Sequence, residues 1–182
     1  MKDRNRNLLI GAVILSAASM LMLNSCKTIP KGVKAVEPFN ADKYLGKWYE
    51  IARMNFRFEK NLNNVTAEYS FREDGKIKVL NKGYNFKKEK WQQTTGKAKF
   101  VDDKNIGKLK VSFFGPFYAG YNVIAIDEDY KYALIAGKNL KYLWILSRDT
   151  TMPEEIKEAY LQKAKDIGYQ VSELVWVKHD LS

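Results

Sequence analysis

The chain of 182 residues is poor in the side chains on which most enzymes and metalloproteins depend. It has one cysteine, Cys26, and one histidine, His179, which lies near the C-terminus. It contains no Gly-x-Ser-x-Gly nucleophile motif, no phosphate-binding glycine loop and no Cys/His cluster with metal-ligand spacing. We therefore expect no catalytic residue, no metal, no cofactor and no disulfide, and we do not expect an enzyme.

Long basic runs are also absent. No run of five or more basic residues occurs, although 31 Lys and Arg outnumber 21 Asp and Glu and give a formal net charge of +10. A nucleic-acid-binding protein needs its positive charge gathered into a patch or stripe, and these lysines are spread along the chain. We interpret the charge as a solvated surface with some attraction to anionic lipid, and we expect no nucleic-acid partner.

The N-terminal apolar stretch is short for a membrane span. Residues 8–23 are uncharged, whereas a membrane-spanning helix needs about 20 apolar residues. A basic start precedes this stretch, and Leu23-Asn24-Ser25-Cys26 follows it. The order resembles the lipobox of bacterial lipoproteins, which implies a signal peptide over residues 1–25 and acylation of Cys26. A plain signal peptide with an incidental cysteine and an uncleaved anchor remain alternatives.

Acylation of Cys26 implies a membrane-attached protein, because two or more acyl chains anchor a protein stably. Lys27 stands where enterobacterial lipoproteins of the inner membrane have Asp, so the resemblance implies a lipid-anchored lipoprotein of the outer membrane, in the bacterial cell envelope. Residues 26–38 contain two prolines and little periodicity, and we expect an acylated N-terminus and tether there. Residues 39–182 are expected to form one domain.

Alternation of apolar and polar residues dominates the chain from Trp48 onward and predicts half-buried strands. Asp74-Gly75 is typical of a tight hairpin turn. The pattern predicts strands at about 46–54, 64–72, 76–84, 90–101, 107–114, 119–127, 131–137 and 141–148. Nearly all the links are short, which favours an all-β fold: an eight-stranded antiparallel up-and-down β-barrel. Such a barrel holds side chains or one small ligand in its interior.

One helix is predicted after the last barrel strand. Thr151 is expected as its N-cap, Pro153 in its first turn and Gly168 at its end. Its apolar residues recur at a spacing of three or four, at Ile156, Tyr160, Ala164 and Ile167. We expect this face to pack on the outside of the barrel, and residues 174–177 to form a short final strand.

Three short motifs occur at the ends of the predicted strands. Gly46-x-Trp48 opens the first strand, behind residues 39–45, which are expected to form a short helical plug. Asp127 and Tyr130 lie in the turn between the sixth and seventh strands, and Arg148 ends the eighth. In this order and spacing, the motifs resemble the signature regions of the lipocalin family. The resemblance implies that they meet at the closed end of the barrel, with Arg148 over the Trp48 indole.

Longer segments resemble the bacterial branch of that family, to which apolipoprotein D-like lipocalins are related more distantly. They are residues 49–53, 81–85, 110–117, 120–125 and 142–148. The resemblance covers about residues 39–178. It implies a membrane-anchored lipocalin that stores or transports lipids, fatty acids such as palmitate or lysophospholipids, in the barrel cavity.

Strand parity predicts which side chains face the interior. Trp48 sets the inward class of the first strand, which then includes Glu50 and Ala52. Small residues such as Gly96 and Ala125 are expected to leave space. The candidate ligand-binding residues are Ala67, Tyr69, Val79, Asn81, Thr94, Val111, Phe113, Tyr121, Val123, Tyr142, Trp144 and Leu146.

The loop of residues 55–63 is the natural lid of the open end. Phe56 and Phe58 are candidates to gate the mouth or to contact a membrane, and ordinary loop packing is the alternative. Arg53, Arg57 and Lys60 are candidate partners for a carboxylate or phosphate of the ligand. A lipid-modifying enzyme on the same scaffold, and a structural envelope protein with a filled barrel, are the alternative functions. The sequence also leaves open a homodimer and the side of the membrane that the protein faces.

Overall fold

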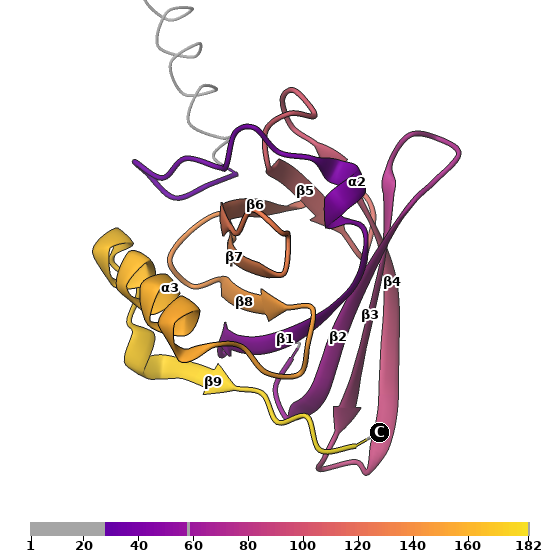
Figure 1. The fold of residues 1–182 in the computed structure, drawn as a ribbon. Helices are drawn as coiled ribbons and strands as arrows, with labels where there is room; N and C mark the ends of the chain where they lie inside the picture. The colour runs from indigo at the N-terminus through magenta and orange to yellow at the C-terminus, as the bar shows by residue number, and fades with distance from the viewer. Residues whose placement is uncertain (1–27, 58, 182) are drawn as a thin grey trace, which may run out of the picture.

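Eight strands close into a barrel, and one long helix lies on its outside (Figure 1). The computed structural model describes residues 28–57 and 59–181. Cys26 and the expected signal peptide lie outside these residues. In the described part of the chain, no helix is long and apolar enough to cross a membrane.

The strands follow one another around the barrel in sequence order, and neighbouring strands are antiparallel. They are β1 (Gly46–Met54), β2 (Leu62–Phe71), β3 (Ile77–Asn85), β4 (Lys90–Phe100), β5 (Lys108–Ser112), β6 (Ala119–Ile126), β7 (Tyr132–Ala136) and β8 (Leu143–Ser147). β1 pairs with both β2 and β8, which closes the barrel. The predicted eight-stranded up-and-down barrel is therefore confirmed.

The connections define two ends of the barrel. The turns at 72–76, 101–107 and 127–131 lie at the closed end, which α2 (Ala41–Tyr44) covers. Asn40 caps α2, because its side-chain oxygen accepts from the Lys43 amide at 3.0 Å. Phe39 and Tyr44 are buried in the interior cluster, so the predicted plug is confirmed. The open end carries the loops 55–61, 86–89, 113–118 and 137–142.

α3 (Glu154–Ile167) packs on the outside of the barrel wall, as predicted. Its Tyr160 and Ala164 are buried in a second apolar cluster that includes β7 and β8 residues. Gly168 ends the helix with a φ of 106°, a left-handed conformation that favours glycine. The short helix η1 (Val171–Glu173) follows, and then β9 (Leu174–Trp176), the predicted final strand, pairs with β1.

The predicted N-cap of α3 is wrong. Pro153 occupies the N-cap position and makes no side-chain cap hydrogen bond. Thr151 lies two residues earlier, and its carbonyl accepts from the hydroxyl of Ser147 at 2.9 Å. The bond ties the chain to the end of β8, and the helix begins only after the proline.

Residues 28–33 lie against the outside of the barrel, and Val36 packs against the interior cluster. The buried side chain of Asn122 donates to the carbonyl of Thr28 at 2.7 Å. The amide of Val36 donates to the carbonyl of Val123 at 2.8 Å. The segment also contributes two side chains to the apolar cluster outside the barrel, Ile29 and Val33.

An irregularity in β1 reverses the predicted parity at its open-end half. The pairing with β8 shifts between Glu50 and Ala52, as a β-bulge does. Ile51 and Ala52 therefore both pack in the outer cluster. Arg53 lies on the inner side instead, where its guanidinium bonds to Glu50. The prediction that Ala52 faces the interior is wrong for this reason.

Two other small residues do not leave the space expected of them. The pairing of β6 with β7 shifts between Val123 and Ala125, and Ala125 packs against the outer cluster. A Cβ atom at Gly96 would lie 2.7 Å from the ring of Phe113. The ring of Phe113 therefore fills the space that a side chain at position 96 would take.

Candidate ligand site inside the barrel

Trp48 and Arg148 seal the closed end of the barrel. Trp48 is fully buried, and its Nε1 donates to the carbonyl of Tyr44 at 2.8 Å. The guanidinium carbon of Arg148 lies 3.8 Å from the centroid of the Trp48 ring, a cation–π contact. The guanidinium also donates to five backbone carbonyls, those of Lys43, Tyr44, Leu45, Lys47 and Tyr130. It thereby joins α2, β1 and the 127–131 turn.

The other signature residues lie around this seal. Gly46 has a φ of 91°, and a Cβ atom there would lie 3.4 Å from Nη1 of Arg148. Asp127 accepts from the backbone amides of Lys131 and Tyr132, at 2.8 and 2.6 Å. The hydroxyl of Tyr130 accepts from the amide of Asn40 ahead of α2, at 2.7 Å. The structure thus brings the predicted signature residues together at one end.

Three tyrosine hydroxyls meet above the plug. The hydroxyl of Tyr121 lies 2.5 Å from that of Tyr44 and 2.7 Å from that of Tyr69. Burial raises the pKa of each of the three phenols above its ordinary value, so all three stay neutral at physiological pH. Two hydrogen bonds use two of the three protons, which leaves one O–H and several lone pairs for another partner. The floor of the interior is therefore polar and uncharged.

Most of the candidate ligand-binding residues lie in the interior cluster. The buried ones are Tyr69, Val79, Val123 and Leu146. The half-buried ones are Ala67, Val111, Phe113, Tyr121 and Trp144. Side chains inside a closed barrel reach solvent only through its interior. These lining side chains are therefore partly exposed from within the barrel.

The remaining candidates lie closer to the open end. Asn81 faces Thr94 across the β3–β4 pair, and Thr94 is exposed. Oδ1 of Asn81 is buried, and no described residue donates to it. This oxygen is an acceptor available to a hydroxyl or amide of a ligand. Tyr142 is half-buried, and its ring stacks with that of Trp144 at 6.4 Å between centroids.

The loop between β1 and β2 closes over this aromatic pair. The ring of Phe56 lies edge-on to the rings of Tyr142 and Trp144, at 5.7 Å from each centroid. Phe56 is half-buried as a result. Phe58, the other predicted gate residue, lies outside the described residues. Phe56 therefore packs on the aromatic pair at the open end.

A buried charge cluster holds the same loop against the barrel wall. Nη1 of Arg53 lies 2.7 Å from Oε1 of Glu50, and Nε lies 3.7 Å from Oε2 of Glu59. Nη2 of Arg53 also donates to the carbonyls of Glu59 and Leu62, at 2.6 and 3.2 Å. Arg53 is only 1% exposed. Its charge, which was expected to bind a carboxylate or phosphate of the ligand, is paired with two carboxylates of the protein. Arg57 and Lys60 are exposed on the loop.

Glu59 is the residue of this site that the sequence did not reveal. It also accepts from Nε1 of Trp144, at 3.1 Å, so it links the loop to a predicted ligand-binding residue. Burial raises the pKa of Glu59 well above its ordinary value, and the nearby carboxylate of Glu50 raises it further. Burial also raises the pKa of Glu50. The only signal in the sequence is an acidic residue between two basic ones in the loop.

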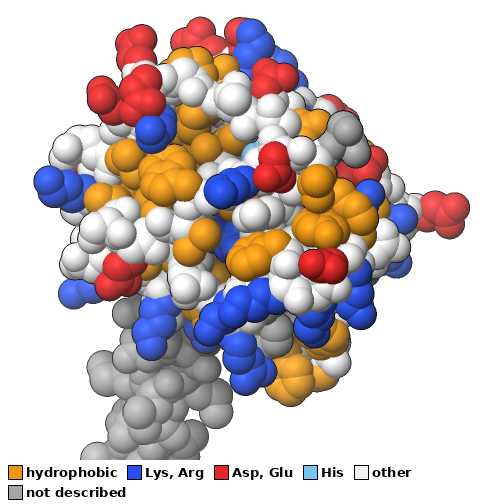
Figure 2. Space-filling model, turned by 90° about the horizontal axis from the view of Figure 1, so that it is seen from below, with side chains coloured by type: hydrophobic (Ala, Val, Ile, Leu, Met, Phe, Trp, Pro, Cys, Tyr) orange, Lys and Arg blue, Asp and Glu red, His pale blue; other side chains and the backbone are white. Residues whose placement is uncertain are grey.

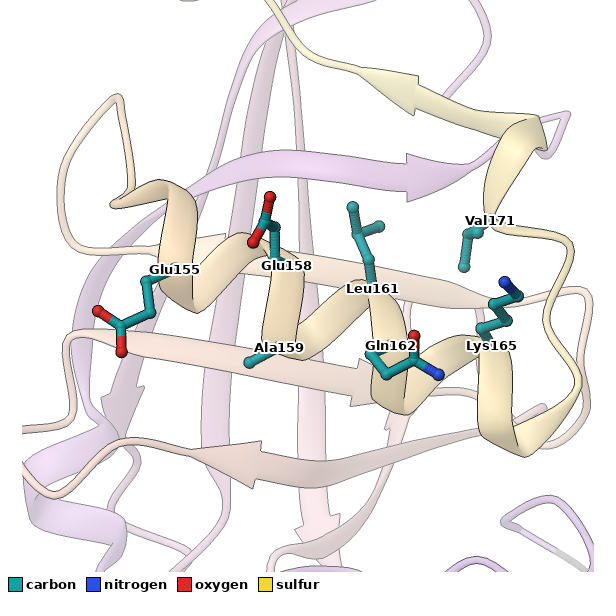
Figure 3. A pocket seen from close by; sticks show the side chains of 7 residues that line it. All are labelled: Glu155, Glu158, Ala159, Leu161, Gln162, Lys165 and Val171. Carbon is teal, nitrogen blue, oxygen red and sulfur yellow. The ribbon is translucent and has the colours of Figure 1, made fainter.

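A surface depression on α3 lies apart from the interior (Figure 3). Its volume is about 520 Å³, and its walls are Glu155, Glu158, Ala159, Leu161, Gln162 and Lys165 of α3 together with Val171. The depression is open, and four of its seven lining residues are charged or polar. It does not offer the enclosed apolar surface that a fatty ligand needs.

Comparisons with known proteins agree with this architecture. The "Outer membrane lipoprotein Blc" of Citrobacter freundii is 53% identical to this chain, over 90% of the chain and 93% of the relative. Temperature-induced lipocalin-1 of Arabidopsis thaliana is 38% identical, over 81% of the chain and 83% of the relative. Among solved structures, insecticyanin from the tobacco hornworm superposes with a TM-score of 0.67 at 20% identity, over 84% of this chain and 87% of that one, which shows the shared fold alone.

The profile of one protein family covers most of the chain. The family is described as "Lipocalin-like domain", and it matches residues 39–179. These residues include both the closed-end signature and the interior lining. This match and the high identity to the bacterial relatives show that the chain belongs to the lipocalin family.

Proposed function

We propose that this protein binds a fatty acid or a lysophospholipid inside the barrel, and stores or carries it at the bacterial cell envelope. The observation that carries the proposal is the partly buried apolar lining between the tyrosine floor and the Phe56 lid. The name "outer membrane lipoprotein", borne by relatives that are 50–53% identical, supports the envelope location.

The interior suits a single acyl chain. A chain of about 16 to 18 carbons gains roughly 12–14 kcal/mol gross on leaving water, at about 0.8 kcal/mol per CH₂. Association and ordering costs remove much of this gain, so micromolar or tighter binding is expected. We place the tail against Val111, Phe113 and Trp144, and the headgroup at the mouth, where Lys60 and Lys141 are exposed.

We propose no catalytic role for the interior. Perturbed carboxyl groups often mark active sites, and Glu59 is such a group. Here the raised pKa has a structural cause, because Glu59 is buried beside Glu50 and is held by Arg53 and Trp144. A role in holding the loop closed accounts for all of its contacts.

Replacing Trp144 with alanine is expected to weaken lipid binding. The loss of this wall should cost about 1.5–3 kcal/mol of binding free energy, a roughly 10- to 150-fold rise in Kd. The measurement is a titration of delipidated protein with palmitate or a lysophospholipid. Native mass spectrometry of protein from its own host should show the bound lipid directly.

Trp91→Ala is the matched control for this titration. Trp91 is 44% exposed on β4, and Lys82 lies over its ring at 4.4 Å, outside the barrel. We expect its replacement to leave lipid affinity unchanged. The lipid-carrier proposal fails if the delipidated wild type binds neither ligand. It fails equally if Trp144→Ala binds as tightly as Trp91→Ala, and a filled barrel would then be the better reading.

We further infer that Cys26 carries the acyl anchor. The N-terminal peptide of the mature protein is expected to begin at Cys26 and to carry the mass of the acyl groups. Cys26→Ser is expected to lose that mass and to leave the outer-membrane fraction, because the remaining chain has no acyl chains to partition into lipid. An unmodified Cys26, or a Cys26→Ser protein that fractionates with the outer membrane, would contradict the anchor.

A further inference from the structure

The open end of the barrel exposes large apolar side chains. Phe117 and Phe114 are 80% and 71% exposed, the two highest values among the exposed large hydrophobic residues of the described chain. Both lie in the 113–118 loop between β5 and β6. Phe86 and Leu140, on two other loops of the same end, are 47% and 41% exposed. Apolar groups gathered on one end of a soluble domain indicate an interaction surface.

The charge of the two ends differs in sign. The four open-end loops contain two acidic residues, one of them the ion-paired Glu59, against six basic ones, which are Arg57, Lys60, Lys87, Lys88, Lys138 and Lys141. The closed-end turns contain four basic residues and seven acidic ones, which are Glu73, Asp74, Asp102, Asp103, Asp127, Glu128 and Asp129. Figure 2, which views the molecule from below, shows basic side chains gathered around apolar ones in the lower part of the face.

The described chain begins beside the same end. Thr28 lies against the first half of β6, where Asn122 donates to its carbonyl at 2.7 Å. A Cβ atom at Gly120 would collide with that carbonyl, so the glycine permits the close approach. β6 starts directly after the 113–118 loop. Two residues of chain reach at most about 7 Å, so Cys26 is confined to the neighbourhood of Thr28.

We propose that the open-end rim, formed by the described residues of the loops 55–61, 86–89, 113–118 and 137–142, docks on an anionic lipid bilayer. Phe114 and Phe117 enter the interfacial region of the bilayer, and the surrounding lysines contact anionic headgroups. The orientation rests on the proposed acylation of Cys26, which brings the acyl chains to this rim. The mouth then opens onto the membrane, and the lipid ligand passes between bilayer and barrel without crossing water.

The test places one fluorescent label at each end of the acylated protein. Cys26 is the only cysteine, and acylation consumes its thiol, so an introduced cysteine can be labelled alone. Gly115→Cys labels the rim and leaves both phenylalanines in place. The substitution fits there, because a Cβ atom at position 115 meets nothing within 4 Å. Glu128→Cys labels an exposed position of the closed end. Both proteins are inserted into vesicles of phosphatidylcholine with phosphatidylglycerol.

The label at position 115 is expected to be shielded from a water-soluble quencher several-fold more than the label at position 128. It is also expected to be quenched by a quencher attached to lipid. Adding Phe114→Ser and Phe117→Ser should remove most of the shielding, and omitting phosphatidylglycerol should reduce it. Equal access of the aqueous quencher to both labels would overturn the proposal.

Native mass spectrometry of the same preparations separates this proposal from the lipid-carrier function. Protein that carries lipid while its label at position 115 stays in water contradicts docking and leaves the carrier function standing. Protein that docks but never carries lipid supports docking and contradicts the carrier function.

Discussion

Replacing Arg53 with methionine is expected to lower the free energy of unfolding by about 3–5 kcal/mol at neutral pH, because it strands buried carboxylates. Glu50 is 4% exposed, and its Oε1 lies 2.7 Å from the guanidinium of Arg53. Glu59 lies on the opposite side of the same guanidinium. The variant also loses two hydrogen bonds to the backbone of the lid loop.

The effect of this substitution depends on pH in a defined direction. Burial holds the pKa of Glu50 and that of Glu59 above their ordinary values, and Arg53 opposes both shifts. A raised carboxyl pKa costs stability when pH lies above it, and the cost disappears as pH falls below the unfolded value. Without Arg53 both pKa values rise further. The deficit of the variant should therefore be largest at neutral and alkaline pH and should shrink on acidification.

Urea unfolding at neutral and mildly acidic pH measures this deficit. Arg72→Met is the matched control, because Arg72 pairs with Asp74 on the surface and is 43% exposed. Exposed ion pairs contribute about 0–1 kcal/mol, so the control should stay close to the wild type. Adding Glu50→Gln and Glu59→Gln to Arg53→Met should restore most of the loss. A deficit that equals the control, or that grows on acidification, would refute the buried-charge explanation.

The barrel could be predicted from sequence because its determinants are local. Alternation in each strand and short turns between strands fix an antiparallel sheet, and eight strands suffice to close it. The α3 helix could also be predicted from the sequence, since its buried Tyr160 and Ala164 recur at helical spacing and Gly168 supplies the left-handed end. The N-cap prediction at Thr151 is wrong because this good capping residue lies two positions before Pro153, which occupies the N-cap.

The inside of the barrel was harder to predict, because one extra residue in a strand inverts every later side chain. The bulge near Ile51 turns Ala52 outward and brings Arg53 inward, where alternation predicts an apolar side chain. Its second partner, Glu59, comes from a loop whose conformation no local pattern specifies. Phe113 filling the space of Gly96 is likewise a contact between strands. Strand parity therefore predicts where the candidate site lies, but it does not predict the buried charge cluster of Glu50, Arg53 and Glu59.

Trp48→Ala is expected to lower the free energy of unfolding by about 3–5 kcal/mol, the usual cost of deleting a large buried aromatic. Its indole is fully buried, bonds to the carbonyl of Tyr44 and lies under the guanidinium of Arg148. The variant leaves a cavity beneath α2 and removes the cation–π contact. Thermal or urea unfolding measures the loss, and Trp48→Phe should recover part of it.

Trp91→Ala again provides the matched comparison, because Trp91 also has a cation over its ring. Lys82 lies 4.4 Å from the Trp91 centroid, but that pair is exposed and should contribute only about 0.5–1 kcal/mol. The buried Trp48–Arg148 pair is desolvated. Arg148 is also held by five backbone carbonyls, so it cannot move to another partner when the Trp48 ring is removed. If the two variants lost equal stability, the closed end would not be the structural seal of the barrel. A larger loss at Trp48 would show that the closed end makes a large contribution to the stability of the fold.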